Sequence, residues 1–162
     1  MKDIRQTFKE KIFECDKHAQ KIEIAKKHIS AFIPLTVNSY QALSEIDTSF
    51  IDQLIYRFSK LQDTLGEKIF PSILTLAHED VKKKTCIDIL NRLEELEVVN
   101  KNEWLKLREM RNEIAHEYSF NTEEVVDSIA IIYKISEQLL DIYHKTVTFC
   151  DERLGIKLEV IK

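Results

Sequence analysis

The sequence predicts an all-α protein: an antiparallel, up-and-down bundle of four to six helices that forms one domain over residues 1–162. Glycine and proline are scarce, with 2 of each, whereas average usage would make them roughly 12% of the chain. Hydrophobic residues make up 44% and charged residues 32% of the composition, which is typical of helices with an apolar stripe and a charged outer face. A β-sandwich, a β-barrel and a glycine-rich phosphate loop are excluded, because each needs clustered turn glycines.

The first helix is predicted over residues 2–31. Pro34 ends it, because proline lacks the backbone N–H that a helix interior requires. Residues 35–48 mix Ser, Asn and Thr with a few apolar residues, which predicts a connector with one helical turn. The apolar positions of the helix recur at three- and four-residue steps, and they are Ile4, Phe8, Ile12, Cys15, Ala19, Ile22 and Ile29.

The second helix is predicted to begin at the cap cluster of Asp47, Thr48 and Ser49. At about 100° per residue, its apolar side chains fall within roughly 140° of arc, the stripe of a core-facing helix. Pro71 kinks or ends it, and a second segment continues to about residue 77. The polar side of the helix forms either a solvated face or one wall of a cleft. The charged residues on that side include Arg57, Lys60, Asp63 and Lys68.

Three further helices are predicted in the second half of the chain. The lysine run at 82–84 marks an exposed loop, which is either a plain surface loop or a contact for nucleic acid backbone. A capping box of Thr85 and Asp88 opens a helix to about residue 98. Asn100 opens the next, over residues 101–117, and Asn121 opens the last, to about residue 152. Short connections favour the antiparallel arrangement.

Charge and cysteine content bound the function. The balance of 24 Lys and Arg against 28 Asp and Glu gives a net charge of −4, so contact with nucleic acid requires a local positive patch. Cys15, Cys86 and Cys150 form no Cys-x-x-Cys pair, which predicts reduced, buried thiols. No signal peptide and no apolar run of ~20 residues is found, so we expect a cytoplasmic protein without membrane contact. No His or Cys spacing fits zinc, and neither a metal nor a cofactor is expected.

In the helix predicted over residues 101–117, one arginine falls on the apolar side. With Trp104 set at 0° and about 100° per residue, the apolar side chains span an arc from about 240° through 0° to 20°. Arg111 falls at about 340°, inside this arc. A guanidinium at a core boundary pairs with a carboxylate or awaits an anionic ligand. The two hypotheses are therefore an ion pair, with Asp63 or Asp52 of the second helix, or an anion site.

A motif begins at this arginine and ends at Tyr118. The string reads Arg-Asn-Glu-Ile-Ala-His-Glu-Tyr, of the form Arg-Asn-x3-His-x-Tyr. It resembles the motif of the HEPN superfamily, whose members carry an arginine, a polar residue and a histidine at this spacing near the end of a bundle helix. The version of the motif with tyrosine two residues after the histidine is similar to that of HepT-type toxins and of the related substrate-binding partners of minimal nucleotidyltransferases. The all-helical pattern extends the resemblance in outline to the whole chain.

The resemblance implies a metal-independent endoribonuclease toxin that acts as a homodimer on RNA. Arg111 would hold the scissile phosphate and stabilise transition-state charge, and His116 would be the general base or acid. A symmetric dimer would supply the second histidine. Asn112 and Tyr118 would position the phosphate. The resemblance further implies a nucleotidyltransferase antitoxin that neutralises the toxin, with Tyr118 as the AMP acceptor.

Structural roles remain open for the same residues. His116 is also placed to cap a helix C-terminus, and Tyr118 to lie in the core with a solvated hydroxyl. For the whole chain, the main alternative is a non-catalytic module that binds a nucleotide or substrate for a minimal nucleotidyltransferase. A third hypothesis is a helical adaptor for protein partners.

Overall fold

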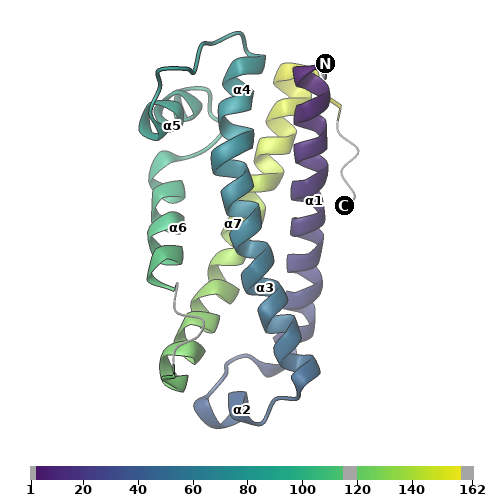
Figure 1. Cartoon of the computed structure of the whole chain (residues 1–162), viewed down its shortest axis with the longest axis vertical. Helices are drawn as coiled ribbons and strands as arrows, with labels where there is room; N and C mark the ends of the chain where they lie inside the picture. The colour runs from purple at the N-terminus through teal and green to yellow at the C-terminus, as the bar shows by residue number, and fades with distance from the viewer. Residues whose placement is uncertain (1–2, 115–119, 158–162) are drawn as a thin grey trace.

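The computed structural model describes residues 3–114 and 120–157, and the elements found there are helical. The chain runs down through α1 (Ile4–Ile29), up through α3 (Glu45–Thr64) and α4 (Phe70–Leu76), down through α6 (Lys101–Glu113) and up through α7 (Thr122–Leu154) (Figure 1). Short helices α2 (Val37–Gln41) and α5 (Cys86–Glu95) lie at opposite ends. The predicted all-α, up-and-down bundle is confirmed in this part of the chain.

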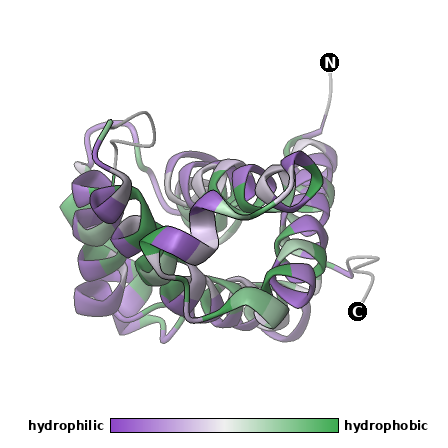
Figure 2. Cartoon of the chain, turned by 90° about the horizontal axis from the view of Figure 1, so that it is seen from below, coloured by the Kyte–Doolittle hydropathy of each residue, from purple (hydrophilic) through white to green (hydrophobic). Residues whose placement is uncertain are grey.

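The long helices enclose one hydrophobic core. Viewed along the bundle, they surround a common interior (Figure 2). The face of α1 that the sequence predicted to be apolar is buried from Phe8 to Ile29, and α3 and α7 pack against it. Tyr143 of α7 lies in this core, where its hydroxyl donates a hydrogen bond to Asp16 of α1 at 3.1 Å. Burial and the neighbouring carboxylate both raise the pKa of this tyrosine.

The first helix was predicted to end near residue 31, before Pro34. The helix itself ends at Ile29, and a 3-10 turn, η1 (Ser30–Phe32), precedes a cis peptide bond between Ile33 and Pro34. The single helical turn expected in the connector is α2, which is capped by Thr36 in a reciprocal box with Ser39. These local caps satisfy backbone groups that helix ends otherwise leave unpaired.

The predicted start of the second helix is wrong by one turn. Ser44 caps α3, because its Oγ accepts a hydrogen bond from the backbone N–H of Asp47 at 3.1 Å. The expected cap residues therefore lie inside the helix, where Thr48 and Ser49 hydroxyls donate to the carbonyls of Glu45 and Ile46. Ser44 and two residues of the expected cluster, Asp47 and Ser49, are about equally good caps on sequence grounds, and the chain uses the earlier serine.

A π-helical turn interrupts the rod where Pro71 was predicted to kink or end it. In η2 (Leu65–Ile69) the backbone N–H of Phe70 bonds to the carbonyl of Leu65, a five-residue spacing, and α4 then continues to Leu76. Pro71 lies in the first turn of α4, where its missing N–H is tolerated. The helix therefore does not end at Pro71: it changes type just before the proline and continues to Leu76, close to the end predicted near residue 77.

In the second half of the chain, the predicted N-terminal caps of the helices are confirmed, but the predicted ends of two helices are wrong. Thr85 and Asp88 form the predicted reciprocal box at α5, and Asn100 and Asn121 cap α6 and α7. However, α5 ends at Glu95 and not near residue 98, because Glu97 adopts a left-handed conformation (φ 63°). Similarly, α6 ends at Glu113 and not near residue 117.

Candidate functional site

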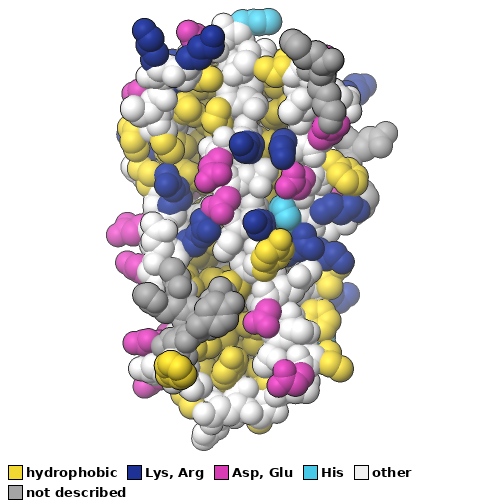
Figure 3. Space-filling model, viewed as in Figure 1, with side chains coloured by type: hydrophobic (Ala, Val, Ile, Leu, Met, Phe, Trp, Pro, Cys, Tyr) yellow, Lys and Arg dark blue, Asp and Glu magenta, His cyan; other side chains and the backbone are white. Residues whose placement is uncertain are grey.

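A pocket of about 480 Å³ opens between α3, η2, α4, α5 and α6. Its buried floor and its more exposed rim differ in chemistry. The floor includes Gln62, Phe70, Leu90 and Trp104, which are at most 2% exposed. The rim includes Asp63, Glu67, Cys86, Arg108, Arg111 and Asn112. Lys, Arg, Asp and Glu side chains intermix over the middle of the face that carries α3 and α6 (Figure 3). The site thus joins an apolar interior to a charged edge.

The predicted site arginine lies on this rim and has a carboxylate partner. Arg111 Nη1 donates to Asp63 Oδ1, and its Nη2 donates to Asp63 Oδ2 at 3.2 Å. The partner is thus one of the two carboxylates expected from the sequence. The two side chains are 33% and 40% exposed, and an ion pair so open to solvent contributes at most about 1 kcal/mol to stability.

The geometry of this pair leaves binding capacity on the arginine. Two parallel bonds to one carboxylate fix the plane of the guanidinium. A guanidinium carries five N–H donors, and Asp63 engages one on each terminal nitrogen of Arg111. Asp63 therefore uses two of the five donors. Asp63 can therefore orient Arg111 without saturating it.

Only the first half of the motif falls within the described residues. Arg111 and Asn112 are consecutive residues in the last turn of α6, and both line the pocket. Ile114 caps the helix, with its backbone N–H bonded to the Arg111 carbonyl at 3.0 Å. His116 and Tyr118 lie outside the described ranges. The structure therefore brings together two of the four predicted site residues.

Several pocket residues were missed by sequence reasoning. Gln62 and Arg108 carry polar groups into the pocket lining, and Trp104 was noted only as a core residue. The signal that could have found this region is Gly66, a glycine inside an apolar helical stripe, which often has a packing or functional reason. A Cβ at Gly66 would lie 3.1 Å from Trp104 Cζ2, so glycine permits close approach of the indole.

The other cations proposed on the second helix do not line the pocket. Arg57 Nη1 lies 3.0 Å from His18 Nδ1 of α1, on another side of α3. Burial, followed by the charge of Arg57, lowers the pKa of His18. Lys60 and Lys68 are exposed, as are residues 82–84 in the loop before α5. Of the four charged residues considered for a cleft wall, Asp63 is the one that lines this pocket.

The three cysteines are free, but they do not share one environment. Cys15 and Cys150 are buried as predicted, and burial raises the pKa of each thiol to about 12. Cys86 is exposed at the first position of α5, contrary to the expectation of three buried thiols. Its sulfur accepts a contact from Arg108 Nη1 at 3.5 Å on the pocket rim. The exposed thiol thus belongs to the candidate site.

Across residues 3–114 and 120–157, no group of three or more His, Cys, Asp and Glu side chains is arranged to hold a metal ion. Within the same ranges, no helix is both long enough and apolar enough to cross a bilayer. Comparisons with protein-family models, with curated proteins and with solved structures find no match to this chain. What can be inferred of its function rests on the pocket and on the motif that reaches its rim.

Proposed function

We propose that this chain is a HEPN-like, metal-independent endoribonuclease of a toxin–antitoxin pair, with Arg111 as the group that binds the scissile phosphate. One observation carries the proposal: the arginine that opens the Arg-Asn-x3-His-x-Tyr string lies on a pocket rim beside Asn112. Asp63 fixes its guanidinium plane while further N–H donors stay available. A planar, permanently charged fork matches a phosphate and the extra charge of its transition state.

The proposed chemistry uses groups on the RNA itself. His116 removes the proton from a ribose 2′-hydroxyl, and the 2′-oxygen attacks the adjacent phosphorus. The bond from phosphorus to the 5′-oxygen breaks, and this oxygen takes a proton from a second acid. The products are a 2′,3′-cyclic phosphate and a 5′-hydroxyl end. In a homodimer, the same histidine of a second copy supplies the acid, which explains why one motif per chain suffices.

A nucleotidyltransferase antitoxin would neutralise the toxin by adding negative charge near the phosphate-binding arginine. The hydroxyl of Tyr118 attacks the α-phosphorus of ATP held by the partner, pyrophosphate leaves, and AMP stays on the tyrosine. The added phosphate carries negative charge and the adenylate adds bulk within the motif. RNA phosphate is then repelled from Arg111, seven residues away in sequence, and cleavage stops.

The direct test is RNA cleavage in EDTA by the purified chain without its partner. We expect wild type to cut RNA, whereas His116→Ala and Arg111→Ala lower the rate by about 100-fold or more, the usual scale for loss of an acid–base or charge-stabilising group. Arg153→Ala is the matched control, because Arg153 is an exposed arginine of α7 outside the pocket. Equal RNA survival with wild type and His116→Ala would contradict the proposal.

The pocket also supports a second candidate, a non-catalytic module that binds a nucleotide for a separate nucleotidyltransferase. Buried aromatic walls beside rim arginines form a binding site whether or not chemistry follows. Expression of the chain alone separates the two. Growth arrest that His116→Ala relieves supports the enzyme, and normal growth with wild type supports the module.

A further inference from the structure

The floor of the pocket contains the buried side-chain amide of Gln62. Gln62 lies in the last turn of α3, is 2% exposed and lines the pocket. Neither its Nε2 nor its Oε1 has a hydrogen-bond partner in the part of the chain that the structure describes. Burying an amide in this way costs free energy, and most buried polar groups are paired. An amide kept here at such a cost points to a ligand with one acceptor and one donor side by side.

The walls around this amide suit a flat ring. Phe70 and Trp104 are each 1% exposed, and their ring centroids lie 4.8 Å apart in an edge-on arrangement. The π-helical turn η2 supplies Gly66, whose lack of a side chain lets the indole of Trp104 pack directly against the helix backbone. Turns of this type are frequent at functional sites, because they displace one helical residue from its regular place.

The rim supplies positive charge at the mouth. Arg108 is exposed one turn before Arg111 on α6, and both line the pocket. Arg108 Nη1 contacts the Cys86 sulfur, which is a weak acceptor and does not neutralise the guanidinium. A phosphate at this mouth would therefore meet a cation that is distinct from the arginine already assigned to the scissile phosphate.

We propose that this pocket binds an adenine nucleotide of the RNA, next to the bond that is cut; this rests on the proposed function. The Gln62 amide donates from Nε2 to a ring nitrogen and accepts at Oε1 from the exocyclic amino group, the bidentate pairing that glutamine makes with adenine. The base lies against Trp104, and Arg108 binds that nucleotide's phosphate. About 480 Å³ accommodates one nucleotide. The chain would thus select its cleavage sites by base.

Trp104 makes the test direct, since it is the one tryptophan of the chain. The fluorescence of the full-length protein is titrated with AMP, GMP, CMP and UMP in EDTA. We expect saturable quenching with AMP at the lowest concentration. Gln62→Leu should weaken AMP binding by about 10–100-fold, the loss expected for one bidentate base contact. Gln53→Leu, at a half-buried glutamine of α3 outside the pocket, should bind like wild type.

Folding and binding are separated by thermal stability. Gln62→Leu replaces an unpaired buried amide by an apolar side chain of similar shape, so its Tm should equal or exceed that of wild type. Loss of AMP binding in such a variant cannot be attributed to unfolding. The thiol of Cys86 gives a second readout, because AMP on the rim should slow its reaction with a thiol reagent while buried Cys15 and Cys150 stay unreactive.

The outcomes distinguish this proposal from RNA cleavage. Equal binding of the four nucleotides, or unchanged AMP affinity in Gln62→Leu, overturns the adenine pocket even if RNA is cut. AMP binding that depends on Gln62 upholds the pocket even if wild type leaves RNA intact, and the failure then belongs to the proposed cleavage. A preference for another nucleotide that Gln62→Leu abolishes overturns the assignment to adenine.

Discussion

At the N-terminal end of α3, Asp47 pairs with His28 of α1, whereas near its C-terminal end Asp63 pairs with Arg111 of α6. The two pairs are about equally open to solvent: the side chains are 24% and 36% exposed in the first pair and 40% and 33% in the second. Each joins α3 to another helix. Exposure alone therefore does not distinguish them.

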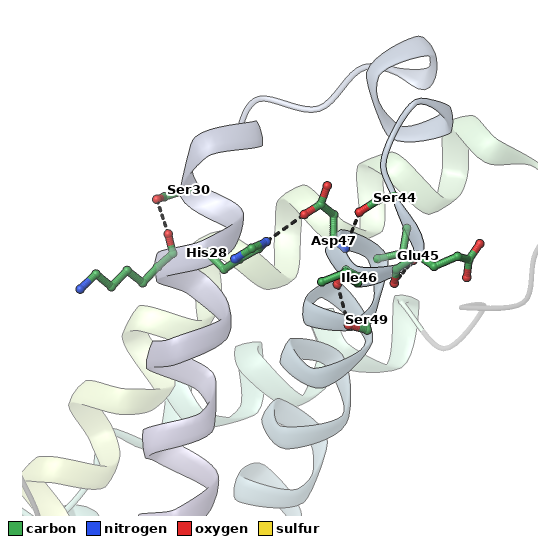
Figure 4. A network of polar contacts seen from close by, with 9 residues as sticks. His28, Ser30, Ser44, Glu45, Ile46, Asp47 and Ser49 are labelled. Atoms are coloured by element: carbon green, nitrogen blue, oxygen red, sulfur yellow. Dashed lines mark hydrogen bonds and ion pairs between the residues drawn. The ribbon is translucent and has the colours of Figure 1, made fainter.

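The surroundings of the two ion pairs distinguish them. At the N-terminal end, the backbone N–H of Asp47 bonds to Ser44 and the side chain of Asp47 bonds to His28 (Figure 4). The His28 ring also stacks on Phe50, with 3.9 Å between the ring centroids. At the other end, the amide of Gln62 has no hydrogen-bond partner among residues 3–114 and 120–157, the helix changes type and a pocket opens. Polar groups at the N-terminal end are paired with one another, whereas at the other end the Arg111–Asp63 pair lies beside an amide that has no partner in the described part of the chain.

The largest expected effect comes from adding a side chain at Gly66, where the indole of Trp104 packs against the helix. Gly66→Val places methyl groups where a Cβ alone would lie 3.1 Å from Trp104 Cζ2, and Trp104 is fully buried. Overpacking of this kind costs about 2 kcal/mol. We expect Tm to fall by about 4–8 °C in thermal denaturation followed by circular dichroism.

The two glycines of the chain offer a matched control. Gly155 caps α7 with φ 65° and has open space around it, so Gly155→Ala is penalised by backbone strain of about 1 kcal/mol and not by packing. Gly66→Ala adds only one methyl group and gains helix propensity, which offsets most of its cost. A Gly66→Val variant as stable as wild type would contradict this prediction, because it would show that the packing around Trp104 adjusts to a larger side chain.

A smaller effect is expected at the satisfied end. Ser44→Ala removes the cap that accepts a hydrogen bond from the Asp47 N–H, at a cost of about 1 kcal/mol in the free energy of unfolding measured with urea. Ser49→Ala is the control, because this hydroxyl donates to a carbonyl inside the helix and contributes little. Equal stabilities of the two variants would argue that the N-terminal end is not set by its cap.

Regular structure was predictable from local sequence because capping and apolar periodicity act over a few residues. The box of Thr85 and Asp88 and the caps Asn100 and Asn121 were identified correctly. The start of α3 was missed because Ser44 and the 47–49 cluster have equal capping chemistry. Their choice depends on tertiary contacts, among them that of Asp47 with His28, nineteen residues away in sequence.

The candidate site was predictable only in part. The angular position of Arg111 on its helix predicted a partner at the core boundary, and Asp63 was one of two carboxylates considered. The pocket was not predicted, because it requires α5, α6 and the π turn to be placed together. Helix type within the rod is also invisible to periodicity, since five residues with i to i+5 bonds leave the apolar stripe almost unchanged.

The smallest expected effect is a change in acid sensitivity at the satisfied end. The hydrogen bond from His28, with those from Ser44, holds the pKa of Asp47 below its ordinary value of 3.8. The stabilisation is complete above that ordinary value and is lost as the pH falls through the lower pKa of the folded state. Asp47→Asn cannot titrate, so its Tm should fall less than that of wild type between pH 7 and about pH 3.

The same pH series on Asp151→Asn, at an exposed carboxylate of α7, gives the control. Its Tm should follow the wild-type curve, because removing a charge is not by itself expected to alter acid sensitivity. Parallel curves for wild type and Asp47→Asn would mean that the bond from His28 orients the ring without favouring the ionised carboxylate. The polar groups at the two ends of α3 would then differ in partner satisfaction but not in electrostatic contribution to the fold.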